Sequence, residues 1–284
     1  ERKLGLFGGW LKGPKLKKTG RFRTEKVGGK WWLVDPDGYL FFSIGACLTG
    51  HRTETLAEQK RAKGNFFSYL PQGKDYLQWT GLRKVGGKQF VNFPAMNYQR
   101  FFGDKWKTKI NQGIHNRNRA WGLNTLGCWS DEGLQKEGKT PYVLISSIWW
   151  QVSGHRKFPS PFRSDFQDDV EKGLKKLAWA KNDPFCLGIF IGNELEWPDR
   201  IGQTLSKMPQ GHPSKKWALE ELRKRGKSTS PASVSDLDDL YLPFVKTFFS
   251  KCKNAVEKIL PETLYLGCRT HRGPSVLGQG ALGS

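Results

Sequence analysis

The segment FCLGIFIGNEL, residues 185–195, is preceded by Pro184 and has an almost entirely apolar middle. Such a run is typical of a β-strand that is buried on both faces. The stretch before it, residues 165–183, has helical spacing, with acidic residues near its start and lysines late, as the helix macrodipole favours. Another apolar run, PYVLISSIWW at 141–150, lies upstream of that helix. The sequence here therefore predicts a strand–helix–strand unit.

The same alternation extends in both directions along the chain. Strands are predicted at 123–129 (LNTLGCW) and 263–269 (TLYLGCR), and helices at 106–120 and 238–260, with another near 217–224. Strands that alternate with helices indicate an α/β fold with a parallel sheet. No GxGxxG or phosphate-binding loop follows the first strand, which favours a (β/α)8 TIM-barrel type over a doubly wound sheet.

The N-terminal part of the chain predicts an antiparallel hairpin ahead of the barrel. FRTEKV (22–27) and KWWLV (30–34) flank Gly28-Gly29, a two-residue turn signal. A second turn at 35–38 (DPDG) leads into YLFFSIGACL (39–48), which predicts a continuous buried strand. Residues 51–100 are polar and predict a long loop that carries short helices. We expect three regions: a basic segment with the hairpin (1–38), a partial barrel (39–272) and an irregular tail (273–284).

Charge is the most unusual bulk property of this sequence. Its 284 residues include 47 Lys and Arg against 26 Asp and Glu, a formal net charge of +21, with a dense basic cluster from Lys12 to Lys30. This balance predicts attraction to polyanions such as nucleic acid, acidic lipid or sulfated polysaccharide, or simply a solvated basic surface. No nucleic-acid-binding module accompanies the charge, and no apolar run approaches the ~20 residues of a membrane helix.

The five cysteines form neither CxxC pairs nor a Cys/His cluster with zinc spacing. Four of them, Cys47, Cys128, Cys186 and Cys268, fall in or beside predicted strands, where we expect buried thiols that behave as small apolar groups. Nothing in the sequence demands a metal or another cofactor.

The predicted strands end in residues that suit a carbohydrate cleft. In TIM barrels the chemistry lies at the carboxyl ends of the strands. Glu194 lies at the carboxyl end of the predicted strand 185–195, beside the amide of Asn193. Hydrolysis of a glycosidic bond needs a carboxylic acid that protonates the leaving oxygen. Glu194 is thus a candidate acid, although an Asn-Glu pair can equally cap the following segment. The other strand ends are rich in Trp, carboxylate, Arg and His: 49–52, 129–131, 149–151, 196–197 and 269–272.

Several motifs together resemble the agarase-type β-glycosidases of glycoside hydrolase family 50. They are FRTEKVGGKWWLVDPDGYLFFSIGACL (22–48), WGLNTLGCWSD (121–131), LGIFIGNELEW (187–197) and LYLGCRTHR (264–272). Their order matches that of the family and they cover most of residues 21–272. The resemblance implies a retaining hydrolase of galactan-type polysaccharides, with Glu194 as acid/base and Asn193 orienting the substrate. It further implies substrate contacts by the following residues: Trp129, Asp131, Trp149, Trp150, Glu196, Trp197, Arg269 and His271.

The chain departs from this family at the second carboxylate. The resemblance places a nucleophilic Glu at the end of strand seven, whereas only five βα units are visible here and no acidic residue follows Glu262. Without a second carboxylate about 5 Å from the first, a retaining mechanism cannot run. The sequence therefore predicts a barrel truncated after its fifth strand. It leaves three functions open: a hydrolase, a catalytically inactive basic polysaccharide-binding protein, and a nonspecific nucleic-acid binder.

Two further expectations concern partners and location. A partial barrel has open parallel edges, so we expect a second copy, another chain or the long loops to cover them. A polysaccharide hydrolase acts where its substrate is, and we expect a secreted or periplasmic protein, with no membrane partner.

Overall fold

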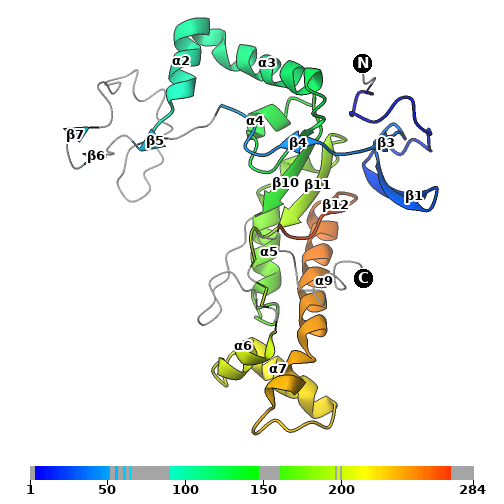
Figure 1. Cartoon of the computed structure of the whole chain (residues 1–284), viewed down its shortest axis with the longest axis vertical. Helices are drawn as coiled ribbons and strands as arrows, with labels where there is room; N and C mark the ends of the chain where they lie inside the picture. Colours follow the sequence, from blue (N-terminus) through cyan, green and yellow to red (C-terminus); the bar gives the residue numbers. More distant parts are fainter. Residues whose placement is uncertain are drawn as a thin grey trace. The chain divides into compact units, whose positions relative to one another are not determined.

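The computed structural model describes residues 4–51, 55–56, 60–61, 64–65, 90–146, 160–195, 197–198 and 200–269. The chain divides into two compact units, one formed by 43–141 and the other by 3–42 together with 142–284. Figure 1 labels the elements along the chain.

The N-terminal part of the second unit is a three-stranded antiparallel sheet. Strands β1 (Arg23–Val27), β2 (Lys30–Val34) and β3 (Leu40–Phe41) follow one another in that order, with Lys26 opposite Trp31 and Leu33 opposite Phe41. The predicted hairpin is confirmed. Gly28 and Gly29 both have positive φ (57° and 78°), as a tight hairpin turn requires.

The turn between β2 and β3 is organised by the buried carboxylate of Asp35. Its Oδ1 accepts hydrogen bonds from the backbone N–H groups of Asp37 (3.0 Å) and Tyr39 (2.9 Å). These bonds reverse the chain within four residues, which is the usual role of Asp at the start of a turn. Burial raises the pKa of this carboxyl group above its ordinary value, against the opposing effect of the two hydrogen bonds.

The remainder of the second unit consists of βαβ units on a parallel sheet. Strand β11 (Cys186–Ile191) lies between β10 (Tyr142–Ser146) and β12 (Leu264–Tyr265) and is parallel to both. Helix α5 (Phe166–Lys175) and the 3₁₀ helix η2 (Ala178–Ala180) connect β10 to β11. Four helices connect β11 to β12: α6 (Gly202–Lys207), α7 (Pro213–Lys224), α8 (Val234–Asp238) and α9 (Tyr241–Ile259).

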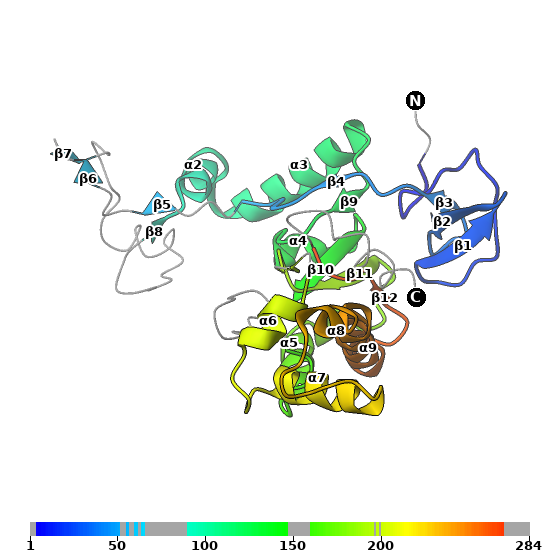
Figure 2. The ribbon, with the colours of Figure 1, turned by 60° about the horizontal axis from the view of Figure 1, so that its bottom comes forward.

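The helices of this unit are held by an aromatic core. Figure 1 and Figure 2 both show α5 beside α9, and there Phe166 meets Phe248 edge to face at 5.8 Å between ring centroids. Farther along, Phe162 stacks on Trp217 of α7 at 4.1 Å, and the buried Phe244 of α9 packs against both. An ion pair from Lys258 to Glu171 (2.7 Å) fixes the other end of the α5–α9 contact.

The first unit contains a short parallel pair and two helices in succession. Strand β4 (Gly45–Ala46) is parallel to β9 (Thr125–Leu126). Helix α2 (Phe93–Phe102), the 3₁₀ helix η1 (Gly103–Lys105), α3 (Trp106–Ala120) and the short α4 (Glu132–Gln135) complete it. Two antiparallel strand pairs belong to the region expected to be a loop: β5 (Thr55–Leu56) with β8 (Phe90–Val91), and β6 (Lys60–Arg61) with β7 (Gly64–Asn65).

Two local predictions were wrong. The run 39–48 is not one buried strand, because β3 ends at Phe41 and β4 starts at Gly45 in a different sheet, with Phe42 and Leu48 exposed. The apolar residues continue without a break from 39 to 48, so the sequence gives no sign that the backbone leaves one sheet and joins another. Cys47, which lies in this run after β4, is exposed rather than buried. Cys268 is only half-buried, whereas Cys128 and Cys186 are buried as expected.

Candidate functional site

The Asn193-Glu194 pair lies just past the carboxyl end of β11, where the backbone takes an unusual course. Gly192 and Glu194 both have positive φ, 86° and 51°. A non-glycine residue in this region is under mild strain and is held there by its surroundings. Leu195 is buried, and its side chain packs over Gly192, so that a Cβ at Gly192 would lie 3.0 Å from Leu195 Cδ1. The sharp turn places the half-buried Asn193 and Glu194 side chains after the last residue of the strand.

Arg269 holds both residues of the pair from the segment after β12. Its guanidinium Nη1 donates to Asn193 Oδ1 (2.8 Å), and its backbone carbonyl accepts from the Glu194 N–H (2.8 Å). Its own N–H donates to Gly192 O (3.2 Å). The hydrogen bond from Arg269 fixes the Asn193 amide with its oxygen toward the guanidinium, so the amide NH₂ is directed elsewhere and can donate to a ligand. Asn193, Glu194 and Arg269, three of the residues named from the sequence, therefore lie together.

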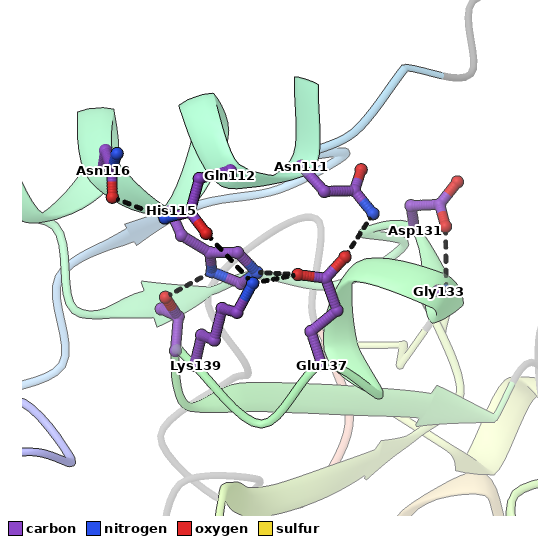
Figure 3. A network of polar contacts seen from close by, with 9 residues as sticks. Asn111, Gln112, His115, Asn116, Asp131, Gly133, Glu137 and Lys139 are labelled. Atoms are coloured by element: carbon purple, nitrogen blue, oxygen red, sulfur yellow. Dashed lines mark hydrogen bonds and ion pairs between the residues drawn. The ribbon is translucent and has the colours of Figure 1, made fainter. Parts of the chain in front are cut away.

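A second group of polar residues lies in the first unit, after β4 and β9. Asp131 is 8% exposed, and its Oδ1 accepts the Gly133 N–H at 2.8 Å, which caps α4 (Figure 3). Its Oδ2 lies 3.7 Å from Nε2 of His51, whose ring meets Trp106 edge to face at 5.0 Å. Trp129, with φ 60°, is 40% exposed. His51 belongs to the strand end at 49–52 that the sequence indicated, although no individual role was predicted for it.

Trp197 occupies a different environment from the one expected of a sugar-binding ring. Its indole contacts Phe248 (5.3 Å between centroids) and Phe249 (5.9 Å) of α9, and it is partly buried against the helical core. These contacts give the ring a packing role. The predicted residues Trp149, Trp150, Glu196 and His271 lie outside the described residues.

A buried polar network ties α3 to the segment after α4 in the first unit (Figure 3). His115 Nδ1 lies 2.8 Å from Thr140 Oγ1, and its Nε2 lies 3.5 Å from Glu137 Oε2. Glu137 also accepts from Asn111 Nδ2 (2.6 Å) and from Lys139 Nζ (2.8 Å). Burial lowers the pKa of His115, against the attraction of Glu137. Burial acts to raise the pKa of Glu137, but its hydrogen bonds from Lys139 and Asn111 outweigh this and lower it.

The described residues contain no metal-binding cluster, and three of their cysteines are buried. No three His, Cys, Asp or Glu side chains gather there in a way that could hold a metal ion. Burial raises the pKa of the Cys186 thiol to about 12 and that of Cys252 further, so both are protonated at neutral pH. Among these residues, no helix is both long and apolar enough to cross a membrane.

Parallel strands that alternate with helices, with an Asn-Glu pair at the carboxyl end of one strand, define an α/β chain of the partial-barrel type seen in glycoside hydrolases. Comparison with known proteins gives a more specific result. The chain is 28% identical to beta-agarase B of Vibrio sp. (strain JT0107) over 92% of its length, and 26% identical to beta-agarase A of the same organism over 85%. No family model matches the chain.

Solved structures agree with the sequence matches. The agarase AgWH50C superposes with a TM-score of 0.82 at 27% identity, and PfGH50B with 0.83 at 25%, each over 98% of this chain. The resemblance to agarase-type glycosidases is therefore confirmed over nearly the whole chain. The chain spans about a third of the length of the two curated relatives (35% and 30%) and about half of the two structures (46% and 50%).

Proposed function

We propose that this chain forms the acid/base half of a glycoside hydrolase that cleaves β-glycosidic bonds in an agar-type galactan by a retaining mechanism. The observation that carries the proposal is the Asn193-Glu194 pair, fixed at the end of β11 by two hydrogen bonds with Arg269, which also donates its N–H to Gly192 O. The similarity to proteins named beta-agarase supports the choice of substrate.

Each residue of the group has a distinct part in the proposed reaction. Glu194 protonates the glycosidic oxygen as the bond to the anomeric carbon breaks, and afterwards takes a proton from the attacking water. Asn193 donates from its amide NH₂ to the sugar 2-hydroxyl, an interaction that strengthens in the transition state. Arg269 positions Asn193. The second carboxylate, which attacks the anomeric carbon, is assigned to no residue of this sequence.

Substrate contacts outside the reacting bond are proposed for the first unit. Trp129 exposes an indole face, on which the apolar face of a sugar ring can stack, and Asp131 accepts hydrogen bonds from hydroxyls. His51, next to Asp131, is added to this proposal because it lies after β4, at the carboxyl end of a parallel strand.

The test is a reducing-end assay on agarose with the natural protein that contains this sequence. Glu194→Gln keeps the size of the side chain but removes its acid, so turnover should fall about 10²- to 10⁴-fold, the usual share of a general acid. The control is Glu257→Gln, which removes one exposed carboxylate from α9 and should leave turnover unchanged. Unchanged turnover in Glu194→Gln would refute the assignment. Binding of agarose without release of reducing ends in the wild type would identify a polysaccharide-binding protein instead.

A further inference from the structure

The hairpin formed by β1 and β2 (Figure 2) carries an exposed aromatic ring and exposed lysines, a feature that the proposed reaction does not use. Trp31 is 72% exposed and lies directly opposite Lys26. Residues directly opposite in an antiparallel pair share a face of the sheet, with Cβ atoms about 4.5–5.5 Å apart. Thr24, also exposed, lies two residues along β1 on the same face. Lys30 is exposed at the turn and, as the neighbour of Trp31 on β2, lies on the other face of the hairpin. We call these four residues the hairpin patch.

The hairpin patch is accessible on the molecule. A Cβ added to either turn glycine, Gly28 or Gly29, would meet no atom within 4 Å. The hairpin is instead anchored from its other end, where Val34, Leu40 and Phe41 are buried. Single exposed apolar residues are common on protein surfaces, so exposure of Trp31 does not by itself indicate a site.

The charge around the ring supplies the second observation. Residues 4–42 contain eight Lys and Arg and three Asp and Glu, a net charge of 8 − 3 = +5. Three of the cations are neutralised in ion pairs: Lys18 with Asp37 (2.7 Å), Arg21 with Glu262 (2.5 Å) and Arg23 with Glu25 (2.7 Å). Lys26 and Lys30 take part in no ion pair within the described residues, so their ammonium groups are available to an anionic ligand.

We propose that the hairpin patch is a binding site for an anionic polysaccharide, namely a sulfated galactan. The apolar face of one galactose unit stacks on the Trp31 indole. A sulfate group on that unit accepts a charge-assisted hydrogen bond from Lys26, which shares the face of the ring, and a sulfate on the neighbouring unit, where the chain passes the turn, accepts one from Lys30. The site requires no bond cleavage and none of the residues after β11, so it is independent of the proposed reaction.

A nucleic acid is a less suitable ligand for this surface. Proteins that hold single strands offer several aromatic rings to successive bases along a basic groove. The hairpin patch has one ring. Lys26 lies in the same residue pair as Trp31, and Lys30 lies in the next pair, so the patch fits a single substituted sugar unit. A comparison of the affinities for carrageenan and for single-stranded DNA therefore distinguishes the proposed site from a general polyanion surface.

The experiment is a binding titration of the whole chain with iota-carrageenan, with agarose oligosaccharides and single-stranded oligo-dT as comparison ligands, at about 50 and about 150 mM salt. One variant, Trp31→Ala, removes the ring. Another, Lys26→Ala/Lys30→Ala, removes the charges. The control for the ring is Trp121→Ala, which removes an equally exposed indole (69%) with the cation of Arg117 over it. The control for the charges is Lys181→Ala/Lys207→Ala, which removes two other exposed lysines.

We expect the affinity for carrageenan to fall about tenfold in Trp31→Ala, the usual effect of losing one stacked ring. The double lysine variant should lose about fivefold and show a weaker salt dependence, since fewer counterions are then exchanged. Both controls should stay within about twofold of the wild type, and all variants should keep the wild-type unfolding midpoint.

Equal losses in the control variants, or oligo-dT binding as tight as carrageenan binding, would overturn the proposal in favour of a nonspecific basic surface. Unchanged affinity in Trp31→Ala would overturn it as well. None of these results depends on hydrolysis, so the outcome is separate from the test of Glu194.

Discussion

At the scale of single residues, the Asn193-Glu194 pair shows how much of a site a sequence can reveal. A strand that runs into Asn-Glu indicates where a carboxylate and an amide lie, because side chains after a parallel strand gather at one edge of the sheet. The partner that fixes them, Arg269, lies 76 residues away along the chain from Asn193. Its backbone and its guanidinium both take part. The strand-end pattern placed 269–272 among the candidate residues, but no local pattern shows that Arg269 binds Asn193 and Glu194.

The coupling between Asn193 and Arg269 leads to a prediction that a double-mutant cycle can test. Asn193→Ala should lower kcat/KM about 10²-fold, because the amide contributes mainly in the transition state. Arg269→Met should lower it about tenfold by releasing the amide. If Arg269 acts through Asn193, the double variant should be no worse than Asn193→Ala alone. Multiplicative losses would show that Arg269 has an independent role.

His115 provides a prediction about pH. Burial lowers its pKa in the folded protein. Below the unfolded value of about 6.5, the unfolded chain therefore binds more protons than the folded one. The contribution of His115 to stability is present above that pH and is lost as the pH falls toward the folded pKa.

The expected slope from this one group is at most about 1.4 kcal/mol per pH unit. Denaturant unfolding at several pH values between about 5 and 7.5 should show stability falling on acidification, and His115→Gln should flatten the curve. An identical slope in His115→Gln would show that other groups govern the pH dependence. His212, whose pKa burial also lowers, is the other candidate, and His212→Gln is the matched comparison.

At the scale of elements, helices were predicted more accurately than strands. The predicted helix at 106–120 has the bounds of α3, and Gly122 follows it with φ 75°. The predicted strands at 123–129 and 263–269 contain β9 and β12, but each of these is only two residues long by its pairing. Pairing depends on neighbours distant in the sequence, whereas helix bonds and caps are local. The division of 39–48 between two sheets escaped prediction for this reason.

The close packing of β11 against β12 can be tested at Gly188. A Cβ at this position would lie 2.7 Å from Leu264 O and 2.8 Å from Leu266 Cγ. Backbone cannot yield as a flexible side chain does, so Gly188→Ala should cost about 1–3 kcal/mol of unfolding free energy, measured by denaturant titration. In α3, a Cβ at Gly113 would meet nothing within 4 Å. Gly113→Ala should therefore stabilise by about 0.5–1 kcal/mol. Equal effects of the two substitutions would contradict the account of the β11–β12 contact.

At the scale of the whole molecule, the chain matches agarases along nearly all its length while spanning about a third to a half of theirs. The order of the motifs was sufficient to predict this resemblance. Each strand of a barrel contributes its own end residues, so the site motifs occur along the sequence in the order of the strands. The bulk charge of +21 predicted a polyanion partner without locating it. Only the structure associates part of that charge with an exposed ring on the β1–β2 hairpin.

The role of Glu194 as the acid/base of a retaining glycosidase can be tested by Glu194→Ala in the natural protein that contains this sequence, assayed with agarose and with a dinitrophenyl β-galactoside. A dinitrophenolate leaves without protonation, so cleavage of this substrate to the glycosyl-enzyme should survive, while agarose hydrolysis falls about 10²- to 10⁴-fold. Added azide, which needs no general base, should restore turnover of the activated substrate and yield a β-galactosyl azide. Agarose hydrolysis at the wild-type rate, or equal loss on both substrates without rescue by azide, would contradict the account.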